Sequence, residues 1–160
     1  MLTFYSNKMK ITVLATVVVF GLISCTEKTE TKVESTSSIA GTWSLVSSKV
    51  ITKGDTVSTF PVKGQEMIKI FNDDTFAFFK HDLSGGKGEA AIFDAGAGTY
   101  TLKDGDYSEH LAYCNYRDWE NRDFQFKLRV QNDSLIQTGI EKIDSLNINQ
   151  EIVEIYVKKK

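Results

Sequence analysis

Residues 124–130 read FQFKLRV, with aromatic and aliphatic side chains at every second position and Gln, Lys and Arg between them. This period of two predicts a β-strand with one dry face and one wet face. Other apolar runs of the chain repeat the period, and no stretch reads as a long amphipathic helix. The expected strands lie at about 42–51, 56–60, 66–71, 75–82, 97–102, 106–114, 122–130, 134–140 and 151–157. Residues 141–150 can form a short turn of helix before the final strand.

Turn-forming residues separate these runs at short intervals, at 53–55, 72–74, 103–106 and 131–134. They predict hairpin loops and therefore an antiparallel meander. A meander with little helix must protect its edge strands, and closure into a barrel does so most completely. The expected fold is all-β, a small antiparallel up-and-down β-barrel of eight to nine strands, with a β-sandwich as the alternative. A barrel of this size is either filled by side chains or holds one small ligand.

The composition of the chain indicates which classes of binding partner to expect. The 160 residues include 19 Lys and Arg against 21 Asp and Glu, a formal net charge of −2, and 41% are hydrophobic. These values are typical of one globular domain and do not favour nucleic acid as a partner. The ten Phe residues can fill a barrel or line its interior.

The N-terminal segment has the pattern of an export signal. Lys8 and Lys10 precede a mostly apolar run over 11–24, which is shorter than the roughly twenty residues that span a bilayer. The run ends in Leu-Ile-Ser-Cys at 22–25, which resembles the lipobox of bacterial lipoproteins; a buried strand or a lone membrane helix is the alternative reading. The resemblance implies that Cys25 carries palmitate-type lipid chains, becomes the mature N-terminus and anchors the protein to the membrane. It places the protein in the bacterial cell envelope, at the outer membrane, on its periplasmic or surface face.

The rest of the chain divides at about residue 39. Residues 26–38 are rich in Ser and Thr with Val33 as the one apolar residue, too little to offset the entropy of ordering. We therefore expect a signal peptide over 1–24, a flexible tether over 25–38 and the barrel domain over 39–160.

Residues 39–46 read IAGTWSLV, which resembles the Gly-x-Trp signature of the lipocalin superfamily. Together with GTYTL at 98–102 and GDYSEH at 105–110, it is similar to the small lipocalin-like lipoproteins of Gram-negative bacteria, many of unknown function. The resemblance implies that Trp43 packs across the closed end of the barrel. It also implies a basic residue stacked on that ring, from near Arg129 or Lys158.

A candidate ligand site lies on the expected strand 106–114. Alternation places Tyr107, Glu109, Leu111 and Tyr113 on one face, where Glu109 and the hydroxyls of Tyr107, Tyr113 and Tyr100 could orient a polar group of a ligand. In the alternative interpretation, Glu109 pairs with a cross-strand Lys or Arg on the solvent face. The opposite assignment, with His110 inward, also remains open.

A second candidate surface lies in the connection 115–122, where Arg117, Trp119 and Arg122 stand close together as in binding hot spots. The alternative is that Trp119 packs under its own loop. The glycine-rich segment 83–98 is a candidate lid.

Metal binding was weighed at His81, Asp82 and Glu109, but no metal or other cofactor is expected because these residues lack metal-ligand spacing. Cys114 is expected to be a small buried hydrophobic residue.

Three functions fit these features. The first is a lipid-anchored protein of the cell envelope that binds a small, largely apolar ligand. The second is a protein-interaction module of the envelope with a filled barrel and a partner protein at 115–122. The third is an enzyme using Glu109 or His110 as acid or base, which is disfavoured because no nucleophile and base stand at workable spacing.

Overall fold

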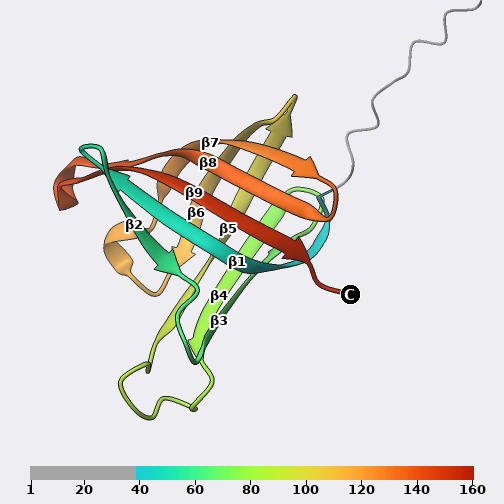
Figure 1. Cartoon of the computed structure of the whole chain (residues 1–160). Coiled ribbons are helices and arrows are strands. Elements are labelled where there is room, and N and C mark those ends of the chain that lie inside the picture. The colour runs from blue at the N-terminus through green and yellow to red at the C-terminus, as the bar shows by residue number, and fades with distance from the viewer. Residues whose placement is uncertain (1–38) are drawn as a thin grey trace, which may run out of the picture. The chain divides into compact units, whose positions relative to one another are not determined.

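The computed structural model describes residues 39–160 and contains nine strands and two short 3-10 helices in that range (Figure 1). The strands are β1 (Gly41–Thr52), β2 (Asp55–Phe60), β3 (Gln65–Phe71), β4 (Thr75–Asp82), β5 (Phe93–Lys103), β6 (Asp106–Cys114), β7 (Arg122–Gln131), β8 (Ser134–Ile143) and β9 (Ile148–Lys158). The helices are η1 (Arg117–Trp119) and η2 (Asp144–Leu146). Within this part of the chain, no helix is long and apolar enough to cross a membrane. The expected signal, lipidation site and tether lie outside the described residues.

The strands close into a barrel. From β3 to β9 each strand pairs antiparallel with the next, and β9 pairs with β1 to complete the ring. On its other edge, β1 pairs with β3 through Gly41–Ser44 and with β2 through its second half. The fold is therefore a closed eight-stranded antiparallel barrel with β2 as one extra strand, as the alternation predicted. Because all these pairings and one shared core lie within 39–160, this segment is a self-contained folding unit.

Local sequence explains most of the strand boundaries. Lys53-Gly54 and Asp104-Gly105 connect hairpins with positive φ at both residues, the conformation that two-residue hairpin loops require. The short helical turn expected within 141–150 is η2, which ends at Asn147 in the left-handed conformation. Strand β5 begins at Phe93, four residues before the expected start at 97.

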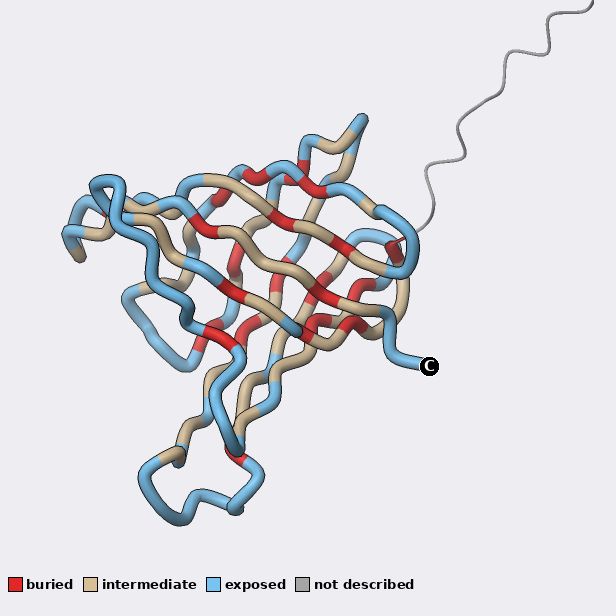
Figure 2. Tube along the Cα trace, viewed as in Figure 1, coloured by how far each residue is buried: buried red, intermediate tan, exposed pale blue. Residues whose placement is uncertain are grey.

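Burial alternates along the strands, as the red and pale segments of Figure 2 show. We call the two ends of the barrel the turn end, with the turns at 72–74, 104–105 and 132–133, and the loop end, with the connections 61–64, 83–92, 115–121 and 144–147. Large inward side chains near the turn end are almost fully buried: Phe71, Tyr107, Leu135 and Tyr156. Tyr100, Leu102 and Val130 pack against them and are half-buried. That end of the core is filled.

Trp43 lies in this filled region, 2% exposed. Its indole Nε1 donates a hydrogen bond to the Ile39 carbonyl oxygen at 2.7 Å, and Lys158 Nζ lies 5.4 Å from its ring centroid. Of the two basic residues that the sequence left open, Lys158 is therefore the one over the ring.

Candidate functional site

A charged side chain lies inside the barrel at Lys69 on β3. The alternation of Met67, Lys69 and Phe71 turns Lys69 inward, where it is 4% exposed. Its Nζ donates hydrogen bonds to Glu109 Oε2 on β6 and to Gln137 Oε1 on β8, each at 3.0 Å. One ammonium group thus connects strands from opposite sides of the barrel. A buried charge needs such pairing, because its desolvation is otherwise costly.

Aromatic rings surround the same ammonium group. Lys69 Nζ lies 5.0 to 5.5 Å from the ring centroids of Phe71, Phe76 and Tyr107, distances at which the ring faces attract a cation. The Tyr107 hydroxyl donates to Glu109 Oε2 at 2.6 Å. Burial and the adjacent Glu109 carboxylate raise the pKa of Tyr107 far above its usual range, so the hydroxyl remains a neutral donor.

Two further carboxyl groups face the interior. Glu154 on β9 alternates with the buried Ile152 and Tyr156, and its Oε2 accepts a 2.7 Å hydrogen bond from the Tyr156 hydroxyl. Glu141 on β8 accepts a 2.8 Å hydrogen bond from Gln150 Nε2. Burial raises the pKa of both carboxyl groups, to about 7 for Glu141. Lys69 partly opposes the rise at each.

These residues define the interior polar cluster: Lys69, Glu109, Gln137, Glu141 and Glu154. Glu109 has its counter-ion in Lys69, whereas Glu141 and Glu154 form no ion pair within the described barrel. Lys80, inward by alternation on β4, is the other cation whose field reaches Glu154. With three carboxyl groups against two ammonium groups, the interior is acidic when all are ionised.

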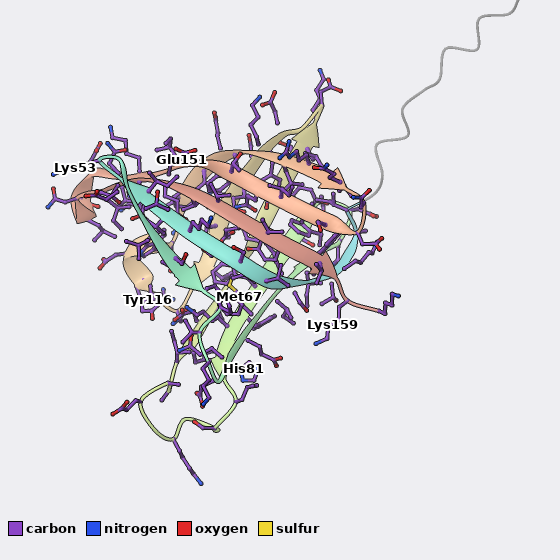
Figure 3. The ribbon with its side chains drawn as sticks, viewed as in Figure 1. Lys53, Met67, His81, Tyr116, Glu151 and Lys159 are labelled. Atoms are coloured by element: carbon purple, nitrogen blue, oxygen red, sulfur yellow. The ribbon has the colours of Figure 1, made fainter. Side chains whose placement is uncertain are left out.

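Parts of this interior remain accessible to solvent. Glu154 is desolvated enough for its pKa to rise, yet its side chain is only half-buried. Inward apolar residues on three neighbouring strands, Val50, Met67 and Phe78, are also half-buried while they pack against the core. Met67 is labelled in Figure 3. These half-buried inward residues all lie on β1, β3, β4 and β9, whereas inward residues toward the loop end on β6, β7 and β8 are buried: Leu111, Phe124 and Ile143. The less filled half of the interior is therefore the half formed by β1, β3, β4 and β9.

Of the four residues proposed as ligand contacts, three lie inside. Tyr107 belongs to the core, and the Glu109 side chain faces the interior, where it bonds Tyr107 and Lys69. Tyr100 packs against the core, and its hydroxyl donates to the Asn72 carbonyl oxygen at 2.7 Å. The alternative that paired Glu109 with a cross-strand Lys or Arg on the solvent face is wrong. Its partner is Lys69, which reaches it through the interior from β3, a strand that does not pair with β6. His110 faces outward and bonds Asp123 at 2.8 Å.

The fourth residue, Tyr113, does not share that face. It is 71% exposed on the outer surface. The pairing of β5 with β6 shifts register between Ala97 and Thr99, so that Leu111 and Ala112 together oppose Gly98. This β-bulge inverts the alternation beyond Leu111. The prediction of one face for Tyr107, Glu109, Leu111 and Tyr113 is therefore wrong for Tyr113, and Cys114 turns inward and is buried, as expected of an apolar thiol.

The three residues weighed as metal ligands point in different directions. His81 Nε2 lies 2.7 Å from Glu66 Oε1 on the outer face, and Glu109 lies inside the barrel. Within 39–160, no group of three or more such ligands converges.

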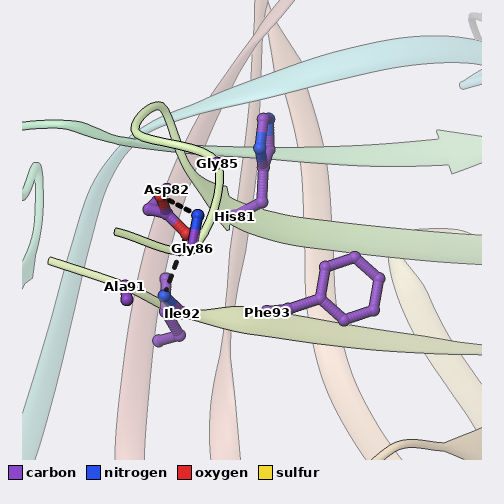
Figure 4. A pocket seen from close by; sticks show the side chains of 7 residues that line it. All are labelled: His81, Asp82, Gly85, Gly86, Ala91, Ile92 and Phe93. Atoms are coloured by element: carbon purple, nitrogen blue, oxygen red, sulfur yellow. Dashed lines mark hydrogen bonds between the residues drawn. The ribbon is translucent and has the colours of Figure 1, made fainter. Parts of the chain in front are cut away.

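Asp82 organises the glycine-rich loop. Its carboxylate accepts hydrogen bonds from the backbone amides of Gly86 and Ile92 (Figure 4). It also accepts hydrogen bonds from the backbone amide and the hydroxyl of Ser84. Led by the Ser84 hydroxyl, these donors lower the pKa of Asp82 well below its usual range. The backbone amides of this loop thus bind the protein's own carboxylate. A lid role for the loop stays a prediction.

The connection 115–121 divides into a packed and an exposed part. Trp119 is half-buried against the core and stacks on Phe124, with ring centroids 6.0 Å apart. Arg122 donates to the Asp118 carbonyl oxygen and to Ser145, and Arg117 is exposed and pairs with Glu120 at 2.9 Å. The interpretation in which Trp119 packs under its own loop is the one that matches this geometry.

Sequence reasoning missed Lys69, Gln137, Glu141 and Glu154. Each is a polar residue at an inward position of an otherwise apolar alternation. Lys69 stands between Met67 and Phe71, and Glu154 between Ile152 and Tyr156. That pattern was the available signal: opposite charges at inward positions of different strands can pair inside a barrel.

Comparisons with known proteins give two structural neighbours at low identity. No protein-family model matches the chain, and no curated protein does. A crystal structure of a lipocalin-like protein from Bacteroides uniformis superimposes with a TM-score of 0.47 at 16% identity, covering 75% of this chain and 97% of that one. An uncharacterized protein from Bacteroides eggerthii gives a TM-score of 0.45 at 13% identity, covering 75% of this chain and 98% of the other.

Proposed function

We propose that this protein binds a small molecule inside its barrel while a lipid on Cys25 holds it in the bacterial cell envelope. The observation that carries the proposal is the uneven filling of the interior. Phe71, Tyr107, Leu135 and Tyr156 fill the interior near the turn end, whereas a group of inward residues on β1, β3, β4 and β9 is half-buried: Val50, Met67, Phe78 and Glu154. Ligand sites in proteins typically combine an apolar lining with a few placed polar groups.

The residues of the less filled half have this composition. Val50, Met67 and Phe78 supply apolar surface from β1, β3 and β4, and Glu154 supplies a polar group from β9. A small, largely apolar ligand with one polar group matches that lining. The lipid anchor rests on the sequence at 22–25 alone.

Native mass spectrometry of residues 39–160, purified without detergent, tests the binding proposal. The expected result is a copurifying small molecule that dissociates on collisional activation. A Met67→Trp variant is the matched control, because a larger inward side chain should displace the ligand while leaving the strand pairing intact. A bare protein mass, together with no change in melting temperature across a panel of lipids and small metabolites, would contradict ligand binding.

Metabolic labelling of the full chain with a palmitate analogue tests the anchor separately. We expect labelling that is lost in Cys25→Ser. Equal labelling of the native protein and Cys25→Ser, or no labelling of either, would contradict the lipid anchor and would leave the ligand-binding proposal unaffected.

A further inference from the structure

We propose that the ligand class of this barrel is an amphipathic amine, a molecule with an apolar body and one protonated amino group, with Glu154 as its counter-ion. This inference rests on the proposed function and assigns the chemistry of the polar group. It follows from which interior charges are already satisfied and which are not.

The interior cation is not available to an anionic ligand. Lys69 Nζ already donates to Glu109 and Gln137 at 3.0 Å and is enclosed by three aromatic rings. A carboxylate or phosphate headgroup would have to displace these partners. It would also enter an interior that holds three carboxyl groups, each of which repels an anion when it is ionised, strongly so because water is scarce.

Glu154, in contrast, can still accept hydrogen bonds. A carboxylate can accept hydrogen bonds at both oxygens, and the Tyr156 hydroxyl occupies one position on Oε2. Glu154 forms none of the ion pairs found among residues 39–160, and the residue as a whole is half-buried. The groups that interact with it are Lys69, Lys80, Glu109, Glu141, Tyr107 and Tyr156. Of the two ammonium groups, Lys69 is committed to Glu109, so an incoming ammonium group competes with Lys80 alone.

The surrounding residues suit the rest of such a molecule. Glu154 pairs across the sheet with Ser48 on β1 and Gln137 on β8, which places polar neighbours at its level. Val50 lies two positions further toward the loop end on β1, and Met67 and Phe78 face inward on β3 and β4. An apolar chain that extends from the carboxylate toward the loop end would cover these half-buried side chains.

The test compares three probes with the same eight-carbon chain: octylamine, octanoate and 1-octanol. Each is titrated below its aggregation concentration into residues 39–160 at pH 7.5 by isothermal titration calorimetry. We expect octylamine to bind roughly tenfold or more tightly than octanol, the ratio expected for a charge-assisted hydrogen bond, and octanoate to bind most weakly.

The decisive variant is Glu154→Gln, which keeps the shape and removes the charge. It should bring octylamine to the affinity of octanol and leave octanol binding unchanged. Glu151→Gln is the matched control, because Glu151 lies on the same strand but is exposed on the outer face (Figure 3). Thermal unfolding checks whether both variants fold. If Glu154→Gln does not fold, Glu141→Gln serves as the second probe of the interior charge.

The outcomes separate the two proposals. Preferential binding of octanoate, equal binding of all three probes, or an amine preference that survives in both interior variants would overturn the amine assignment while leaving a ligand-binding barrel. Binding of none of the probes also overturns the assignment. The copurification experiment then decides whether the binding proposal fails with it.

Discussion

Replacing Lys69 with Met should destabilise the barrel more than any other single loss of charge. Lys69 is the counter-ion of Glu109 and a hydrogen-bond donor to Gln137. Met preserves the length of the side chain but leaves Glu109 inside the barrel without a cation. Removing one partner of a buried pair costs about 3 to 5 kcal/mol. For a domain of about 120 residues this corresponds to a fall in melting temperature of roughly 10 to 20 °C.

A double-mutant cycle isolates the pair. In Lys69→Met with Glu109→Gln, no unpaired charge remains at this position, so the double variant should be more stable than Lys69→Met alone. Glu109→Gln alone should cost less than Lys69→Met, because Lys69 keeps the Gln137 acceptor and its three aromatic neighbours. Lys127→Met is the control: Lys127 is an exposed lysine on β7 paired with Asp106, and exposed pairs contribute about 0 to 1 kcal/mol.

Urea unfolding of residues 39–160 at pH 8 and pH 5, monitored by tryptophan fluorescence, measures these free energies. The deficit of Lys69→Met should be smaller at pH 5, because Glu141, whose pKa burial raises to about 7, is protonated there and no longer gains from the Lys69 cation. Additive single and double variants, or a Lys69→Met cost no larger than that of Lys127→Met, would refute the assignment of Lys69 as the counter-ion of the interior.

Three further predictions concern other parts of the barrel. Burial raises the pKa of Glu141 to about 7 from 4.5, so ionisation of Glu141 destabilises the fold as pH rises through this range. In urea titrations, the free energy of unfolding of Glu141→Gln should exceed that of the native protein by about 1 to 3 kcal/mol at pH 8 and should equal it at pH 4. Trp119→Ala should cost about 2 kcal/mol in thermal unfolding, because it removes the stack on Phe124 and half-buried contacts, whereas Arg117→Ala should stay within about 0.5 kcal/mol; equal effects would contradict the packed position of Trp119. Gly98→Ala should cost more than about 3 kcal/mol and raise hydrogen exchange across β5 and β6, because its Cβ would lie 1.8 Å from the His110 carbonyl oxygen; a variant as stable as the native protein would contradict the bulge geometry.

The strands were predictable because most of them carry their own pattern. In β7 the inward Phe124, Phe126 and Leu128 are buried and their polar neighbours are exposed. The two-residue turns at 53–54 and 104–105 carry Gly at a position of positive φ, which local chemistry alone favours. Closure of the barrel was then a consequence of protecting edge strands.

Two departures share one cause, which is pairing that the local sequence does not encode. Residues 93–96, Phe-Asp-Ala-Gly, have little strand propensity, but β4 pairs with them from Lys80 opposite Asp94 to Phe78 opposite Gly96. The bulge opposite Gly98 arises where β5 and β6 approach so closely that only Gly fits. Both features depend on a neighbouring strand. Strict alternation of inward and outward side chains along β6 therefore predicts the wrong face for Tyr113.

The interior polar cluster was harder to predict because a charge in an apolar alternation has two opposite interpretations. The charge can mean that the buried face of the strand ends there, or that the charged side chain is itself buried and paired with an opposite charge. Which of the two holds depends on residues far away in the sequence. Lys69 and Glu109 are 40 residues apart, and Lys69 and Gln137 are 68 apart. Only barrel closure brings them within 3.0 Å. The same closure places Glu154 near a lysine that is already paired with Glu109. The arrangement that stabilises the barrel around Lys69 thus leaves Glu154 without an ion pair among the described residues, which is the feature on which the proposed amine site rests.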